Sequence, residues 1–108
     1  HTHPETEVLY VLDGEFEVGI GAERTRAGAG SVIQVRPGTP HSTKNVGARA
    51  GRLLSVYMPG AADRFFLDAG SPVAYDVAQI DFDRPADLTG IDIPAVLAIA
   101  QRHGMRIV

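Results

Sequence analysis

The chain has 108 residues, a length that allows one domain with a single modest core. Hydrophobic residues make up 44%, and the formal net charge is −3 with no basic run, so nothing indicates nucleic-acid binding. No apolar stretch approaches the roughly 18–20 residues that a membrane helix needs, and no signal peptide is evident. Cysteine is absent, which excludes disulfides and thiolate ligands; we expect a cytoplasmic protein, because this composition fits a reducing compartment.

The first sixty residues alternate short apolar runs with turn signals. Asp13-Gly14 is a two-residue hairpin signal. After it, Phe16, Val18 and Ile20 alternate with acidic neighbours, so we expect them to face a core. We predict strands over residues 7–12, 15–20, 24–26, 31–35, 41–46 and 52–58. Short strands at this spacing predict an all-β sandwich or barrel.

After Gly60 the pattern changes to helix signals. A short helix is expected over residues 61–69, with Gly70 as its C-cap, and residues 71–93 are expected to form an irregular connection. Asp92 can cap a second helix that continues to residue 103, where Gly104 ends it. We therefore predict a single domain over residues 1–108, with a barrel over about 1–60 and a helical, irregular extension over 61–108.

Four side chains in the first half have the chemistry of metal ligands. His1 and His3 are separated by one residue, so an extended chain points both imidazoles to the same face. Glu7 is also an odd-numbered residue and points to that face if no bulge intervenes. A third imidazole, His41, follows the turn-forming residues 36–40. Three neutral nitrogens and one carboxylate oxygen suit a divalent transition metal such as Fe, Mn, Ni, Co, Cu or Zn. We predict that His1, His3, Glu7 and His41 bind one such ion.

The spacing of these residues resembles the two sequence motifs of the cupin superfamily. His1-x-His3-x3-Glu7-x6-Gly14 resembles the first motif, and Gly30-x5-Arg36-x-Gly38-x2-His41-x3-Asn45 resembles the second. Arg36 stands where the family pattern usually has Pro. The chain also begins at the first ligand, where a cupin normally has one or more strands and a Gly, so we expect N-terminal strands of the domain to be missing.

The second half resembles a group of small bacterial cupins that are loosely called quercetin-dioxygenase-like. In this group a Pro-Gly-x-x-x-Arg-Phe-Phe-like helix follows the barrel, and a C-terminal helix ends in Arg-His-Gly. Residues 59–66 and 102–104 match these two features. The resemblance implies a cupin jelly-roll β-barrel, followed by a short helix and a C-terminal helix.

The resemblance also implies a mononuclear metal-dependent enzyme acting on a small organic substrate, with a dioxygenase favoured over an isomerase or cyclase. In cupins that cleave flavonols, the residue matching Glu7 is thought to accept a proton from a substrate hydroxyl, which would make Glu7 catalytic. A metal held by three neutral ligands and one anion keeps a net positive charge. We expect the barrel wall to line a dry pocket around it, formed by Leu9, Val11, Phe16, Val18, Ile33, Val35, Leu54 and Val56.

Other interpretations stay open on the sequence alone. His1 and His3 can be an expression-tag remnant, Glu7 an exposed edge carboxylate, and His41 a turn histidine bonded to the backbone. A free N-terminal amine and the imidazole of His1 can also chelate copper, as in copper monooxygenases that attack polysaccharides. The contrasting functional class is a non-catalytic module that binds a small molecule or metal, such as a sensor barrel.

The C-terminal residues predict a homodimer. The second helix carries an apolar stripe of Val96, Leu97, Ile99 and Ala100, and an apolar tail follows over residues 105–108. Packing this segment over a neighbouring barrel would hide both with two-fold symmetry, whereas folding back on its own barrel is the alternative. We expect His103 to be structural, at the helix C-terminus. Asn45 either lines the cavity or bonds its own turn.

Overall fold

The computed structural model describes residues 1–72, 76–81, 84 and 88–108, and within them six strands precede the helical segments. The strands are β1 (Thr6–Asp13), β2 (Glu15–Ile20), β3 (Glu23–Gly28), β4 (Val32–Val35), β5 (His41–Asn45) and β6 (Arg52–Met58). The helical segments are α1 (Asp63–Ala69), the 3-10 turn η1 (Val77–Gln79) and α2 (Ile93–Arg102). None of the described helices is both long enough and apolar enough to cross a membrane.

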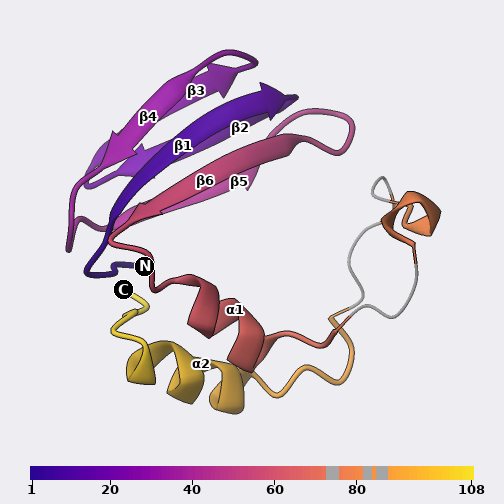
Figure 1. Ribbon diagram of the computed structural model, residues 1–108. Coiled ribbons are helices and arrows are strands. Elements are labelled where there is room, and N and C mark those ends of the chain that lie inside the picture. Colours follow the sequence, from indigo (N-terminus) through magenta and orange to yellow (C-terminus); the bar gives the residue numbers. More distant parts are fainter. Residues whose placement is uncertain (73–75, 82–83, 85–87) are drawn as a thin grey trace.

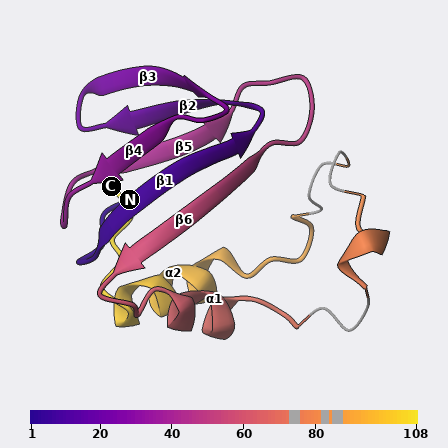
Figure 2. The same ribbon diagram turned by 45° about the horizontal axis from the view of Figure 1, so that its top comes forward.

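The strands form two antiparallel three-stranded sheets, in the orders β4-β1-β6 and β3-β2-β5. Figures 1 and 2 show the two sheets as facing layers, with α1 and α2 together on the side of β6. The predicted all-β jelly roll with two following helices is therefore confirmed. Within the predicted irregular region, η1 is an additional element, and residues 73–75, 82–83 and 85–87 lie outside the described part of the chain.

The core lies between the two sheets and follows the predicted alternation of β2. Phe16 and Val18 are buried there, as expected, and Ile20 packs against the cluster from its partly buried position. The buried cluster consists of Leu9, Val11, Phe16, Val18 and Ala27, with Ile20, Ile33 and Leu53 packed against it. Because alternate residues of a strand share a face, β1 and β2 direct their remaining side chains outward.

The expectation that Leu54 and Val56 line the pocket is wrong. Their side chains are 50% and 44% exposed, on the outer face of the β4-β1-β6 sheet. Leu53 and Tyr57 are the partly buried residues of β6 instead. The error has a physical cause: β6 carries apolar side chains at both parities, so alternation does not tell which face is buried.

Helix α2 begins and ends as the sequence predicts. The Asp92 side chain accepts a hydrogen bond of 3.0 Å from the backbone of Ala95, and Gly104 takes a φ of 77° just beyond the end of α2. His103 Nε2 lies 2.7 Å from Asp68 Oδ2 of α1, so its role is to tie the two helices together. Asn45 bonds its own turn, accepting from Gly47 and donating to the carbonyl of Arg49, at 2.9 Å each.

Candidate metal centre

The residues that precede β1 run alongside the turn that leads into β5. His1 and His41 exchange backbone hydrogen bonds of 3.0 Å in both directions, and the Gly38 amide donates to the carbonyl of His3 at 2.8 Å. Gly38 has a φ of 71°, a left-handed conformation that glycine adopts without steric cost. Pairing the backbones in this way brings two sequence motifs, some forty residues apart, to one place.

The C-terminal tail holds the same N-terminal residues from another side. Thr2 and Arg106 form an isolated antiparallel bridge, with hydrogen bonds of 2.8 and 2.9 Å. Gly104 lies so close to Pro4 that a Cβ on it would come within 3.3 Å of the proline ring. Residues 1–4 are therefore fixed both by the β5 side of the domain and by the chain that follows α2.

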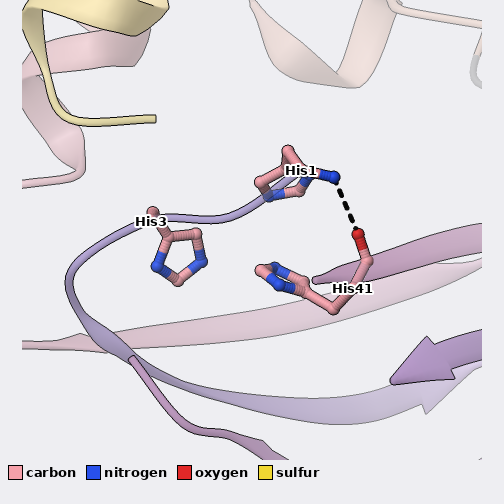
Figure 3. A group of neighbouring side chains, drawn as sticks. All are labelled: His1, His3 and His41. Atoms are coloured by element: carbon pink, nitrogen blue, oxygen red, sulfur yellow. Dashed lines mark hydrogen bonds between the residues drawn. The ribbon is translucent and has the colours of Figure 1, made fainter. Parts of the chain in front are cut away.

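Three imidazoles converge at this place, as Figure 3 shows. His1, His3 and His41 each offer one ring nitrogen, and these nitrogens lie within 4.8 Å of one another. The ring of His41 lies 4.3 Å from that of His1 and 4.7 Å from that of His3, measured between centroids. His3 and His41 are buried and His1 is partly buried, so the cluster is shielded from most of the solvent.

Glu7 lies beside two of these imidazoles. Its Oε2 atom is 3.1 Å from Nε2 of His41 and 3.3 Å from Nε2 of His3. Only 4% of the Glu7 surface is exposed, which excludes the interpretation of this residue as an exposed edge carboxylate. The structure thus places Glu7 beside His3 and His41, and clusters these two imidazoles with that of His1.

The protonation of His41 can be deduced from its surroundings. Its Nδ1 lies 2.8 Å from the carbonyl oxygen of Thr39, and since a carbonyl only accepts, Nδ1 carries the proton. In the neutral ring Nε2 then has a lone pair, is buried, and makes no hydrogen bond within the described part of the chain. It faces the carboxylate of Glu7, so two acceptors oppose each other unless a cation or an extra proton lies between them.

This donor set fits a transition-metal ion. Imidazole nitrogens and a carboxylate oxygen are the ligands that divalent iron, nickel, copper and zinc accept. A bound cation would satisfy the lone pair of His41 and the charge of Glu7 together, which isolated buried groups cannot do. The residues present are therefore suited to the ion that the sequence predicts.

Two further residues of the site, Glu5 and Tyr57, were not predicted. Glu5 is 5% exposed, with Oε2 at 3.4 Å from Nδ1 of His3. The alternation of side chains in an extended chain could have indicated Glu5, because residues 1, 3, 5 and 7 point to the same face. Tyr57 is paired directly with Glu7 across β1 and β6, and its ring meets that of His3 edge-on at 5.5 Å. Tyr57 would have been identified if the buried face of β6 had been assigned correctly.

The phenol of Tyr57 is kept protonated by its surroundings. Burial raises its pKa from 10.0 to about 12, and the negative charge of Glu7 together with a hydrogen bond to that carboxylate acts in the same direction. A hydrogen bond with Ser55 opposes these effects, and the charge of Glu5 adds a smaller increase. Tyr57 is therefore a neutral phenol beside Glu7 at physiological pH.

A cavity of about 130 Å³ adjoins the imidazoles of His1 and His41. Its other lining residues are Gly19, Gly21, Arg24, Pro40, Ser42 and Val108. The Arg24 guanidinium donates to two backbone carbonyls, and it fits there because position 19 is glycine: a Cβ would lie 2.8 Å from its Cζ. The surface beside the site is thus partly polar, whereas the sequence predicted an apolar lining.

The raised pKa of Tyr57 predicts how stability depends on pH in the metal-free protein. The folded state holds this proton more tightly than the unfolded state, so the stability it contributes is full below pH 10 and is lost as pH rises toward about 12. Tyr57→Phe should remove this loss of stability at high pH. It should also remove the phenolate transition that an ultraviolet titration shows at high pH. Tyr10→Phe, at a 37% exposed position, is the control and should leave both in place. A late transition that survives in Tyr57→Phe would contradict the assignment.

Comparison with known proteins agrees with the motif spacing. The family model described as the cupin domain matches residues 1–57, more than half of the chain. Quercetin 2,3-dioxygenase of Bacillus subtilis (strain 168) is 35% identical over 80 residues, which cover 73% of this chain and 23% of that enzyme. The chain therefore spans less than a quarter of the length of this curated relative.

Two solved structures share the fold. An RmlC-like cupin from Shewanella frigidimarina NCIMB 400 matches with a TM-score of 0.52 at 28% identity, covering 58% of this chain and 55% of that one. TT1209 from Thermus thermophilus matches with a TM-score of 0.51 at 33% identity, covering 53% of this chain and 55% of that one. The family model, the two facing sheets and these two structures agree, and the chain belongs to the cupin family.

Proposed function

We propose that this protein is a mononuclear metal-dependent enzyme that acts on a small organic molecule, with dioxygenase chemistry favoured. The observation that carries the proposal is the buried carboxylate of Glu7 facing Nε2 of His3 and Nε2 of His41. The similarity to an enzyme named quercetin 2,3-dioxygenase supports the choice of reaction. The lack of cysteine supports a reducing, cytoplasmic location.

In this proposal His1, His3, His41 and Glu7 hold the ion. When bound, iron or copper would supply Lewis acidity and the capacity to activate dioxygen. Glu7 has a second role, because a carboxylate beside the substrate can accept a proton from its hydroxyl group. Tyr57, which is paired with Glu7 across β1 and β6, places a neutral phenol beside this carboxylate.

The shape of the surroundings supports a substrate with one acidic, chelating end. The cavity beside His1 and His41 has polar groups in Ser42 and Arg24, and the barrel core next to the site is apolar. A catechol or flavonol combines such an end with a planar apolar body. An anionic oxygen at the chelating end would be attracted by the guanidinium of Arg24.

One prediction of this proposal concerns metal binding. His41→Ala should lose most of the bound metal after loading, because it removes a buried ligand nitrogen, while the far-ultraviolet circular dichroism spectrum stays that of a β protein. His103→Ala is the matched control, since its imidazole contacts Asp68 and lies outside the cluster. Elemental analysis of both dialysed variants and the wild type gives the stoichiometry. Equal metal content in His41→Ala and wild type would refute the site.

Another prediction of this proposal concerns the reaction. Metal-loaded protein should consume oxygen with at least one member of a catechol and flavonol panel, and Glu7→Gln should slow this by about 100-fold or more. An oxygen electrode with product analysis makes the measurement. Conversion without oxygen uptake would point to an isomerase or cyclase. Metal binding with no conversion of any substrate would favour the non-catalytic binding module.

We also propose that residues 1–108 form one domain and that two copies pair. The outer face of the β4-β1-β6 sheet supports this, because apolar residues gather there at exposed positions: Tyr10, Leu12, Val32, Leu54, Val56 and Met58. On the helices, Phe66, Ile93 and Leu97 are exposed as well. Apolar surface of this extent on one sheet is unusual for a monomer, and a second copy would cover it with two-fold symmetry.

A charge on the outer face tests this pairing. Val56→Glu should convert the dimer into a monomer, since a carboxylate would have to be buried without a partner at the interface. Ala48→Glu introduces the same charge in the exposed turn between β5 and β6 and should stay dimeric. Light scattering at tens of micromolar protein measures the mass. A monomeric wild type would refute the dimer.

A further inference from the structure

Gly19 is a glycine within β2 that the backbone conformation does not require. Its φ lies outside the left-handed region, and a glycine inside a strand is less favourable than a residue with a side chain. Neighbouring side chains take the space instead: a Cβ here would lie 2.7 Å from Oγ of Ser42 and 2.8 Å from both Cζ and Nη1 of Arg24. Both neighbours are paired with Gly19 in the register of the sheet. The glycine therefore makes room for a guanidinium and a hydroxyl.

The guanidinium of Arg24 is held in place although the residue is exposed. Its Nη1 atom donates to the backbone carbonyls of Gly21 and Glu23, at 3.1 and 2.9 Å. These two bonds use both hydrogens of Nη1, and the N–H groups of Nε and Nη2 make no hydrogen bond within the described residues. The Nε–Nη2 edge of a guanidinium is a planar fork that matches the two oxygens of a carboxylate. Arg24 is therefore fixed by one nitrogen and keeps its carboxylate-binding edge for a ligand.

The cavity beside the metal centre provides the place for such a ligand. Arg24 and Ser42 line it together with His1 and His41, two of the proposed metal ligands. Its volume of about 130 Å³ equals that of about four water molecules, at roughly 30 Å³ each. It therefore has room for a carboxylate and the atom that carries it, next to the place where the other end of the same molecule would reach the metal.

We propose that Arg24 is a specificity-determining residue that binds a carboxylate of the substrate, with the Ser42 hydroxyl as a second donor. The inference rests on the proposed function, because it names the substrate class of the same site: a small organic acid whose other end chelates the metal. The charge of Arg24 is available for this role, since it forms no ion pair within the described part of the chain. Arg26, on the same face of β3, instead lies 3.9 Å from a carboxylate oxygen of Glu15.

Acetate binding to the metal-free protein tests the carboxylate site, because acetate then has no metal ion to bind. The amide signals of Gly19 and Ser42 in NMR spectra should shift saturably with acetate and stay in place with acetamide, its uncharged counterpart. Arg24→Gln should weaken acetate binding about 10-fold or more, since it removes the charged donor. Gly19→Ala should weaken it as well, because the added Cβ displaces the guanidinium and leaves its charge intact. Arg26→Gln removes the same charge from the same strand and should bind acetate like the wild type.

Ligand affinity in the zinc-loaded protein tests the link to the substrate. At least one isomer of dihydroxybenzoate should bind about 10-fold more tightly than catechol, which has the same chelating oxygens and no carboxylate. This advantage should disappear in Arg24→Gln and persist in Arg26→Gln. Isothermal titration calorimetry measures the affinities without any need for turnover.

The outcomes distinguish this proposal from the proposed function. Acetate binding that is absent from the wild type, or equal in Arg24→Gln and wild type, would overturn the role of Arg24 and leave the metal site untouched. Equal weakening in Arg24→Gln and Arg26→Gln would also overturn it, since general charge would then be the cause. Binding of inorganic phosphate without acetate would overturn the carboxylate as the ligand. If acetate binds as expected but the protein takes up no metal, the metal enzyme is refuted while the anion site is supported.

Discussion

The arrangement of the site depends on one buried carboxylate surrounded by imidazole nitrogens. Glu7 is almost fully removed from water, yet Nε2 of His41 and Nε2 of His3 lie beside the same oxygen atom. A hydrogen bond to the Thr39 carbonyl commits the proton of His41 to its far nitrogen. Acceptors that face each other in a low-dielectric interior repel, so the native arrangement requires a cation or extra protons at their centre.

The domain brings this arrangement about by joining three distant parts of the chain. β1 supplies Glu7 from the middle of its sheet, and β6 places Tyr57 directly opposite. The residues before β1 are held by the turn leading into β5 and by the segment that follows α2. The C-terminal extension therefore supports the residues that carry the clustered imidazoles, although it contributes no ring to the cluster. This dependence gives the two helices a function in a fold whose core is made by strands alone.

The sequence predicted those features that local patterns determine. The strict alternation of β2 predicted its bounds and its buried face, and parity with turn chemistry pointed to the three clustered histidines and to Glu7 beside two of them. The prediction failed for β6, because both faces of this strand carry apolar residues. It placed the exposed Leu54 and Val56 in the pocket and did not identify Tyr57. The bridge between Thr2 and Arg106 was also missed, because no local pattern encodes a contact across a hundred residues. Glu5 had the right parity, but an acidic residue next to a proline is ordinarily expected at a solvent-exposed position.

The second carboxylate changes the electrostatic character of the site. Three imidazoles and Glu7 alone would leave a divalent ion with a net positive charge, which attracts anionic substrates. Glu5 is just as buried, so the two positive charges of such an ion would be matched by two carboxylates. If a substrate hydroxyl bound as an anion and its proton left the site, the buried site would carry excess negative charge, which is costly away from water. Binding would therefore be most favourable if a nearby group kept the proton. Under the proposed function, Glu7 is the acceptor that would keep that proton, because it lies beside two of the imidazoles.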